Sequence, residues 1–507
     1  MASIERNTGD ATREQFDLVI VGGGIYGAML MLEAGRQGLK SLLLEKDDFG
    51  AATSFNNNRI VHGGLRYLQS MHLSRFYESV AERSWFLREF PDLVRPMACL
   101  MPLYGGLARN RVLLKAALTM NDILSRHRNH GLTGTQCLPN GSILNAARTR
   151  ERFPGARADG LVGAALWYDA AMPDCHRLLI ETLRWGVAAG GAALNYVEAT
   201  HLLDRHNKVS GIAARDTRSG SELEFRAPLV VNAAGPSARL LAERFTGRTQ
   251  KFHVPSLAWN LLLNVQALDE PGIARTAYAV QSPSPGSRMY FLQCLDDRML
   301  VGTGHAGLPP DSNTTTVAEQ NIEQMLKEIN EAVPALNLGV ADVARIFAGQ
   351  LPVREPMSTD LAAVPALIDH AAQGGPAGLF TVSGVKYTTA RSTAERLIAK
   401  FSARVDGRRP HARRHFPRRP PANAYQLRPG ENLSHAAWTQ RARNLIATES
   451  PQSLIDLLMH RSDLVNKPDI ALELADDACS AFGWDQAKCT IETKKLEEYV
   501  GSTFIVK

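Results

Sequence analysis

Residues 16–28 read FDLVIVGGGIYGA, and this stretch decides the fold that the sequence predicts. A short apolar strand runs directly into the glycine-rich turn at residues 22–27, and the apolar-periodic AMLMLEAGRQG that follows is typical of a helix. A second strand, SLLLEK, then ends at Glu45. Strand, glycine-rich turn, helix and strand in this order form the βαβ unit of dinucleotide-binding folds.

The glycines of this turn have separate physical roles. Gly22 permits the tight turn, Gly24 lets the backbone approach a pyrophosphate, and Gly27 allows the helix to pack closely on the strand. Glu45, eighteen residues after Gly27, is placed to bind a ribose hydroxyl. A glycine-rich turn alone is a weak signal, but the two strands, the helix and the acid together predict nucleotide binding.

The fingerprint by itself does not distinguish NAD from FAD. Its position near the N-terminus, with a long chain after it, favours FAD. Residues 229–236, LVVNAAGP, predict a strand that ends in small residues. Such a strand commonly returns to the nucleotide-binding sheet of flavoproteins, although taken alone it would indicate only a buried strand and a turn.

Length and composition indicate a globular protein of two or three domains. The chain has 507 residues, of which 45% are hydrophobic and 21% charged, and domains usually have roughly 100–200 residues. No apolar window long enough for a transmembrane helix occurs, and the polar N-terminus argues against a secretion signal. The six cysteines have neither a CxxC pair nor metal-ligand spacing. We therefore expect reduced thiols, a cytoplasmic location and no metal site.

The basic excess is concentrated in one stretch. The formal net charge is +6, and residues 407–421, GRRPHARRHFPRRPP, are rich in arginine. Prolines among and after the arginines favour a solvated linker at 405–430 over a nucleic-acid-binding patch. No nucleic-acid partner is expected.

A second segment, residues 52–68, reads ATSFNNNRIVHGGLRYL and is too polar for an ordinary core helix. Together with VGGGIYGA, it resembles the FAD-dependent glycerol-3-phosphate dehydrogenase family, within the D-amino-acid-oxidase-like flavoproteins. NAAGP, GTGH at 302–305 and SGVKYTTAR at 383–391 resemble later family blocks more loosely. The tail from about residue 433 is similar to the family's C-terminal helical cap, so the likeness covers most of the chain.

The resemblance implies an α/β fold. A Rossmann-like FAD-binding domain of the glutathione-reductase type would carry an inserted antiparallel-sheet substrate domain and a C-terminal helical cap. Strands of the substrate sheet are expected in LAWNLLLNVQ and RMYFLQCLDD. The expected boundaries are 16–105, 160–250 and 341–404 for the discontinuous FAD domain, 106–159 and 251–340 for the substrate domain, 405–430 for the basic linker and 431–507 for the cap.

The resemblance also assigns residues to the cofactor. Thr53 and Ser54 would lie near the pyrophosphate, while Gly63 and Gly64 would let the backbone pass close to the isoalloxazine. Thr388 and Thr389 would begin a helix whose dipole stabilises negative charge on the flavin. The expected FAD-contacting residues are Gly22, Gly24, Gly27, Glu45, Thr53, Ser54, His62, Gly63, Gly64, Ala234, Gly235, Gly384, Lys386, Thr388 and Thr389.

The reaction that the resemblance implies is hydride transfer from a CH–OH carbon of a small, polar, anionic substrate to FAD. A base must take the hydroxyl proton, and histidine suits this role near neutral pH, so His62 is the first candidate. Arg66 and Lys386 would hold the anion or stabilise the reduced flavin. The expected catalytic residues are His62, Arg66 and Lys386, and the expected substrate-binding residues are Tyr67, His305 and Arg354.

Simpler interpretations exist for each of the three catalytic candidates. Lys386 taken alone would be a surface lysine, and His62 a histidine satisfied by ordinary hydrogen bonds. Arg66 would be a buried structural arginine paired with Glu78 or Glu82.

The sequence departs from the family on the substrate side. The family block Ser-Gly-x-Arg-Pro corresponds to AGQLPV at residues 348–353, so Leu351 replaces the arginine that binds the substrate phosphate. Losing one charge-assisted contact costs about 1.5–3 kcal/mol, unless Arg354 compensates. His305 replaces a family aspartate, and PSLAWN at 255–260 replaces a Lys-Gly-Ser-His stretch. These changes favour an altered substrate.

Three hypotheses remain open from the sequence. The first is a flavoenzyme that oxidises a CH–OH carbon. The second is an amine or amino-acid oxidase or dehydrogenase of a specialised biosynthetic pathway, suggested by Leu351 and by the tryptophan of PSLAWN. The third is a non-catalytic protein that retains the fold. The electron acceptor (oxygen, a quinone or a carrier protein) and a homodimer also stay open.

The segment 107–130 combines an apolar helical face with several basic residues. It would either lie on the inner face of an anionic membrane, as in peripheral members of the family, or pack against the core with a solvated basic face.

Overall fold

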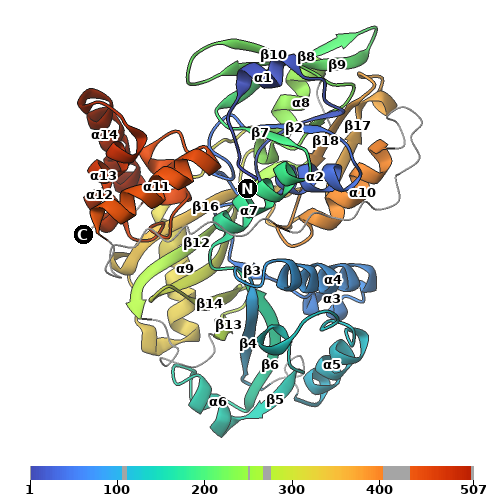
Figure 1. Ribbon diagram of the computed structural model, residues 1–507. Coiled ribbons are helices and arrows are strands. Elements are labelled where there is room, and N and C mark those ends of the chain that lie inside the picture. Colours follow the sequence, from blue (N-terminus) through green and yellow to red (C-terminus); the bar gives the residue numbers. More distant parts are fainter. Residues whose placement is uncertain are drawn as a thin grey trace.

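The chain contains two large sheets and a C-terminal helical unit that lie side by side (Figure 1). This arrangement confirms the expected α/β class with a second, separate sheet. The computed structural model describes residues 2–105, 111–248, 252–266, 276–362, 364–402, 419 and 434–503.

The first sheet has six strands in the order β17-β18-β11-β1-β2-β7. All neighbours are parallel except β17, which is antiparallel to β18. The two strands of the fingerprint are adjacent, and the strand predicted within 229–236 returns between β1 and β18, as expected. The strands are β1 (Leu18–Val21), β2 (Ser41–Leu44), β7 (Ala192–Leu194), β11 (Val230–Asn232), β17 (Ala366–Asp369) and β18 (Leu379–Ser383).

Alternate residues of β1 contact different layers, because successive side chains of a strand point to opposite faces. Leu18 and Ile20 belong to the core that includes α2, whereas Val19 and Val21 belong to the core under a three-stranded sheet. Coverage on both faces explains why these strands are continuous apolar runs. The covering elements are α2 (Ile25–Arg36), α7 (Cys175–Ala188) and α10 (Ala390–Ser402) on one face, and β8 (Val197–Arg205), β9 (Lys208–Asp216) and β10 (Glu222–Arg226) on the other.

The second sheet has nine strands and is antiparallel except where β13 pairs in parallel with β4. Both strands predicted from LAWNLLLNVQ and RMYFLQCLDD belong to it, as β12 and β14. The strands are β3 (Ile60–Val61), β4 (Arg95–Leu103), β5 (Ser142–Asn145), β6 (Gly163–Ala171), β12 (Val254–Gln266), β13 (Thr276–Gln281), β14 (Met289–Leu295), β15 (Arg298–Gly307) and β16 (Val343–Val353).

The two faces of this sheet differ in what covers them. Leu257 and Leu261 of β12 pack on one face with residues of α9 (Glu319–Ala332). Asn260, which alternates with them along the strand, donates to the carbonyl of Asn56 at 3.1 Å. The second face is therefore covered by the segment 52–64, and we refer to it as the site face.

The remaining helices lie around these layers. No helix among the described residues is long and apolar enough to span a bilayer. The remaining helices outside the C-terminal unit are α1 (Thr8–Arg13), α3 (Leu65–Gln69), α4 (Leu73–Glu89), α5 (Arg111–Leu124), α6 (Ala146–Arg152) and α8 (Ala238–Thr246).

The C-terminal unit is helical, as expected, and has its own hydrophobic core around Trp438 and Leu457. Cys479 and Cys489, ten residues apart, form a disulfide within it. The expectation that every cysteine stays reduced is therefore wrong for this pair, which a tertiary contact between two helices brings together. The helices are α11 (His435–Glu449), a π-helix (Ile455–His460), α12 (Pro468–Glu473), α13 (Ala475–Phe482) and α14 (Gln486–Thr503).

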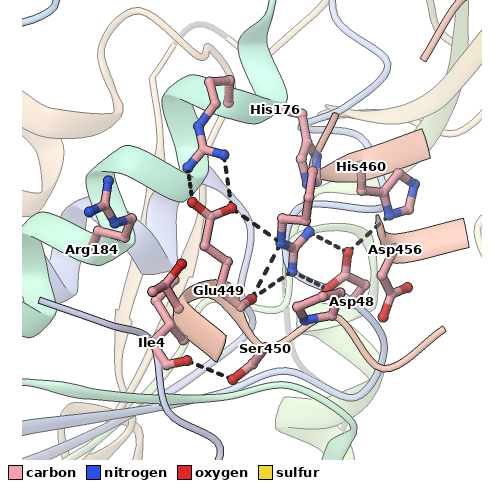
Figure 2. A network of polar contacts seen from close by, with 12 residues as sticks. Ile4, Asp48, His176, Arg184, Glu449, Ser450, Asp456 and His460 are labelled. Carbon is pink, nitrogen blue, oxygen red and sulfur yellow. Dashed lines mark hydrogen bonds and ion pairs between the residues drawn. The ribbon is translucent and has the colours of Figure 1, made fainter. Parts of the chain in front are cut away.

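A buried ionic network joins this unit to the rest of the chain, and Figure 2 shows its members converging from separate elements. Arg461 donates to both carboxylate oxygens of Asp48 at 2.7 Å each, and His460 Nδ1 lies 2.9 Å from the same carboxylate. Glu449 accepts two hydrogen bonds from Arg177, at 2.8 and 2.6 Å. Bidentate pairs of this kind fix position as well as charge, so the helical unit is held to α7 and to the loop after β2.

The domain boundaries given above stay a prediction. Strands β4, β6 and β16 begin or end near the limits of the expected FAD segments and belong to the second sheet. The expected linker at 405–430 lies outside the described residues, apart from Arg419, whose guanidinium lies 2.5 Å from Asp92.

Candidate active site

The segment 52–64 connects the two sheets. The hydroxyl of Ser54 accepts the backbone N–H of Ile25, the first residue of α2, at 2.9 Å. The hydroxyl of Thr53 donates to the carbonyl of Gln350 in β16 at 3.1 Å. The segment that was expected near the pyrophosphate therefore runs from the glycine-rich turn onto the site face.

The three consecutive asparagines hold this segment in shape. Asn57 accepts the N–H of Arg59 at 2.7 Å and donates to the carbonyl of Ser54 at 2.7 Å, which closes a local turn. The carbonyl of Asn58 accepts from Gln293 of β14 at 2.6 Å. Asparagine suits such turns because its short amide bonds to nearby backbone groups.

The glycine-rich turn leaves no room for side chains at two of its glycines. A Cβ on Gly22, whose φ is +112°, would lie 2.5 Å from the carbonyl oxygen of Ala233, and one on Gly27 would lie 1.9 Å from that of Gly22. At Gly24 the nearest atom to a Cβ is the hydroxyl of Ser54, at 3.0 Å. The turn is therefore packed on its inner side and accessible at Gly24, beside Ser54.

Glu45 lies at the edge of this turn. Its carboxylate accepts the N–H of Gly23 at 2.6 Å and that of Asp47 at 2.9 Å. Burial raises its pKa above the usual value, against the lowering effect of these two hydrogen bonds. A largely desolvated carboxylate with spare acceptor capacity at the glycine-rich turn suits the hydroxyls of a ribose.

His62 follows β3 and lies on the site face beside Asp169 of β6. Its Nδ1 is 3.2 Å from Oδ2 of Asp169, and the two side chains are 47% and 5% exposed. The ring also lies 5.5 Å from that of Phe291. One edge of the imidazole is therefore anchored in the protein interior while the ring remains accessible.

Close packing against α4 explains why residues 63 and 64 are glycines, which the sequence alone did not reveal. A Cβ on Gly63 would lie 1.9 Å from Nη1 of Arg83, and one on Gly64 would lie 2.8 Å from Cβ of Ser79. Gly64 also has a φ of +83° where it begins α3. Both glycines thus permit close approach to α4, and their expected role toward a flavin stays a prediction.

Arg66, Tyr67 and Lys386 come together, as the sequence predicted for the catalytic and substrate groups. Nζ of Lys386 lies 4.2 Å from the centroid of the Tyr67 ring. Partial burial and, after it, repulsion by Arg66 lower the pKa of Lys386 to about 8, although much of the side chain is exposed. This corner of the site thus concentrates positive charge.

The structural alternative for Arg66 is wrong. Arg66 is exposed, and among the described residues no ion pair involves it. Glu82 pairs instead with Arg391, and Glu78 with Arg396 at 2.6 Å.

The block SGVKYTTAR packs against the fingerprint. Tyr26 donates to the carbonyl of Lys386 at 3.1 Å, and its ring fills the space that a Cβ on Gly384 would need. Thr388 and Thr389 are buried directly before α10, where they were expected, and Ala234 and Gly235 follow β11 at the carboxyl end of the first sheet.

Leu351 lies on the site face, directly opposite Ser256 in the paired strands. The hydroxyl of Ser256 donates to the carbonyl of Leu351 at 3.0 Å, so it accepts from Nε2 of His305 at 2.7 Å. Burial and repulsion by Arg288 lower the pKa of His305 to about 4. His305 is therefore neutral near pH 7, and Leu351 places an apolar side chain beside it.

Two residues named from the sequence lie apart from this cluster. Arg354 is exposed beyond the end of β16, where its charge adds to the effect of burial in lowering the pKa of His253. Trp259 packs in the core on the α9 face, with its indole against Gly304. Because neighbouring positions of a strand alternate between faces, the tryptophan of PSLAWN does not line the site, and it no longer supports the amine hypothesis.

Comparison with known proteins agrees with this arrangement. Residues 17–399 match the sequence model of the DAO family, whose description is FAD dependent oxidoreductase. The chain belongs to the DAO family of FAD-dependent oxidoreductases. The glycerol-3-phosphate dehydrogenase of Synechocystis sp. is 27% identical over 421 residues, which cover 79% of this chain and 72% of that protein.

Solved structures share the fold of this DAO-family chain. The glycerol-3-phosphate dehydrogenase of Bacillus halodurans, complexed with FAD, aligns with a TM-score of 0.74 at 19% identity, covering 99% of this chain and 98% of that one. L-proline dehydrogenase from P. horikoshii aligns with a TM-score of 0.54 at 16% identity, covering 78% and 96%. Both carry the same fold with different named substrates.

The residues of the fingerprint fit the cofactor of the DAO family. The accessible turn at Gly24 and the N-terminus of α2 suit a pyrophosphate, and the carboxylate of Glu45 suits a ribose. Thr53, Ser54 and the segment to Gly64 would then hold the remainder of FAD along the site face.

The sequence did not predict Asp169 or the two side chains that donate to it, Arg83 and Trp167. Asp169 accepts hydrogen bonds from Arg83 at 2.9 Å and from Trp167 at 3.3 Å, besides its contact with His62. A signal was available, because Asp169 interrupts the small and apolar strand GAALWYDAA. An acid in a strand that is otherwise buried must find partners, but the sequence does not say which.

Proposed function

We propose that this chain oxidises a CH–OH carbon of a small polar anion related to glycerol 3-phosphate. The observation that carries the proposal is the group of two cations beside a candidate base. Lys386 contacts the ring of Tyr67, and Arg66 lies close enough to affect its pKa. Arg66 and Tyr67 belong to α3, which begins a few residues beyond His62, whereas Lys386 lies between β18 and α10.

The residues divide the reaction between them. Arg66 and Lys386 would bind the anionic group and thereby orient the carbinol carbon, since a fixed anion loses little further freedom on reaction. His62 would take the proton of the substrate hydroxyl on Nε2. FAD, when bound, supplies the two-electron acceptor for the hydride.

Leu351 narrows the class of substrate. An apolar side chain makes no ionic contact with a phosphate, so the anion would depend on Arg66 and Lys386. We therefore propose a substrate that is smaller or less charged on the side of Leu351 than the family standard, or one that binds more weakly.

Anaerobic flavin bleaching tests the proposed reaction. The FAD-loaded protein is mixed without oxygen with glycerol 3-phosphate, other polyol phosphates and uncharged polyols. We expect at least one anion to abolish the absorbance of oxidised flavin, and Lys386→Met to raise the concentration required. If every CH–OH anion leaves the flavin oxidised, the proposed reaction is wrong.

A second candidate is oxidation of a C–N bond in an amine or amino acid. It is motivated by Leu351 and by the neutral His305 beside it, which would accept an apolar group on this side of the site. Bleaching by an amino acid, with none by polyol phosphates, would favour this alternative. Family membership argues against the third, non-catalytic hypothesis.

We also propose that α5 makes a peripheral contact with an anionic membrane. Val112, Leu113 and Ile123 on this helix are 77%, 59% and 60% exposed. The basic residues Arg111 and Lys115 are exposed on the same helix. Exposed apolar side chains beside cations are typical of interfacial helices.

A further inference from the structure

Asp169 is the most heavily bonded carboxylate near His62. Oδ1 accepts the N–H of Gly63 at 2.6 Å and Nη1 of Arg83 at 2.9 Å. Oδ2 accepts Nε1 of Trp167 at 3.3 Å and lies 3.2 Å from Nδ1 of His62. A carboxylate offers about four acceptor sites, so these partners use all of them.

Asp169 is ionised at neutral pH. Burial favours its neutral form, but the hydrogen bond from His62, the charge of Arg83 and the N–H of Gly63 together lower its pKa below the usual value. An ionised carboxylate has no proton to donate. The hydrogen between the two side chains therefore belongs to Nδ1 of His62.

This assignment determines the other nitrogen of the ring. In a neutral imidazole that carries its proton on Nδ1, Nε2 is an acceptor. Among the residues that the structure describes, no group hydrogen-bonds to Nε2 of His62. The side chain is also partly exposed on the site face, so its accepting nitrogen remains available to a substrate hydroxyl.

We propose that Asp169 is the positioning residue of this enzyme: it holds His62 in the Nδ1–H tautomer, with Nε2 ready to accept a proton. This inference rests on the proposed oxidation of a CH–OH carbon. In that reaction the O–H bond would break as its proton moves to Nε2 and the C=O bond would form, and FAD, when bound, would supply the acceptor for the C–H hydride with its electron pair. The resulting imidazolium is stabilised by the adjacent carboxylate, as in other base–carboxylate pairs.

A purely structural role is the alternative, because Asp169 also neutralises the buried Arg83. Substitution Asp169→Asn separates the two roles. The amide oxygen would keep the bonds from Gly63 and Arg83, which turns the NH₂ group toward His62 and Trp167. The bond from the Trp167 indole is lost as well, and the control Trp167→Phe measures that loss alone. Nδ1 would then have to accept, and the proton would move to Nε2, where it blocks the base.

Nitrogen-15 NMR of histidine-labelled, FAD-loaded protein measures this tautomer directly. His62 is assigned by comparison with His62→Gln, since the chain has 14 histidines. We expect protonated Nδ1 and unprotonated Nε2 in the wild type, the reverse in Asp169→Asn, and the wild-type tautomer in the control Trp167→Phe, which removes another donor to the same oxygen. Protonated Nε2 in the wild type would overturn the inference, even if the variant fails to fold.

Kinetics supply the second test. Asp169→Asn should lower kcat by about 10²–10⁴-fold, the range of general-base catalysis, with a smaller change in KM. In the His62→Gln background the same substitution should have little further effect, because the two residues act as a unit. If the two substitutions lower kcat independently, so that the loss in the double variant is the product of the two single losses, Asp169 acts structurally and the inference is overturned.

Failure of the proposed function gives a different pattern. In that case no CH–OH anion bleaches the flavin of any variant, including the wild type. The NMR measurement requires no substrate, so the tautomer of His62 still confirms or contradicts the role of Asp169.

Discussion

At the scale of single residues, the site depends on a few charged groups that differ in burial and in the charges around them. Asp169 is buried and fully bonded, whereas partial burial and, after it, the charge of Arg66 lower the pKa of Lys386. Carboxylate and ammonium therefore titrate far apart, which leaves both charged near pH 7. This separation allows one group to hold a base and the other to hold an anion.

The lowered pKa of Lys386 predicts a pH dependence of substrate binding. Lys386 is cationic below pH about 8 and neutral above it, so KM for an anionic substrate should rise as the pH increases through this value. Lys386→Arg should remove the rise, because arginine stays charged. Steady-state kinetics between pH 6 and 10 measure the effect, and an identical rise in the arginine variant would contradict the assignment.

Leu351 predicts a gain of affinity on substitution. If the substrate is a phosphate that lies beside this residue, Leu351→Arg should add a contact of about 1.5–3 kcal/mol and tighten binding roughly ten- to a hundredfold. Leu351→Met is the matched control, because it keeps the volume and adds no charge. Flavin-absorbance titrations measure the affinity, and equal values for both variants would exclude a phosphate beside Leu351.

At the scale of elements, the segment 52–64 and the C-terminal unit are linked through the loop after β2. Asp48 lies in this loop, shortly before Ser54, and is bonded to Arg461 and His460. Glu449 and Arg177 form a second buried pair between α11 and α7. The helical cap thus supports the region that the cofactor is expected to contact.

Breaking the second pair should loosen the cap. Glu449→Gln removes the negative charge that pairs with the buried Arg177. Removing one member of a buried ion pair typically lowers the free energy of unfolding by about 3–5 kcal/mol. Thermal unfolding and FAD retention after gel filtration report the loss. Glu498→Gln is the matched control, because Glu498 is exposed and its pair with Lys494 is 4.0 Å long. Equal melting temperatures for the two variants would show that the pair of Arg177 and Glu449 does not hold the C-terminal helical unit in place.

The exposed apolar side chains of α5 predict membrane binding. Wild-type protein should float with vesicles that contain anionic lipid, and Val112→Glu combined with Ile123→Glu should abolish flotation without changing flavin content. Neutral vesicles provide the control for the basic residues. Flotation of the double variant to the wild-type extent would show that α5 is not the contact.

At the scale of the whole molecule, local patterns predicted more than long-range ones. The strands and helix of the fingerprint, the return of β11 and the helical C-terminus follow from periodicity and from residues close in sequence. Motif likeness also predicted the proximity of Arg66, Tyr67 and Lys386. These features are encoded in short stretches, each of which has one compatible local structure.

The features that were missed depend on contacts between distant segments. His62 and Asp169 are 107 residues apart, and Arg177 and Glu449 are 272 apart. Cys479 and Cys489 are close in sequence, but they lie on different helices, α13 and α14, and their disulfide depends on how these helices pack. Trp259 lies on the α9 face of β12 and not on the site face. The sequence shows that neighbouring residues of a strand alternate between faces, but not which face of the sheet borders the site.

The proposed reaction removes a hydride from a CH–OH carbon while His62 takes the hydroxyl proton. The most direct test is anaerobic stopped-flow reduction of the FAD-loaded protein by glycerol 3-phosphate, or by the polyol phosphate that bleaches best, with and without deuterium on the carbinol carbon. We expect the deuterated substrate to bleach the flavin more slowly, and His62→Gln to bleach it about 10²–10⁴-fold more slowly. Full bleaching at equal rates with both substrates and in the variant would contradict the proposed reaction.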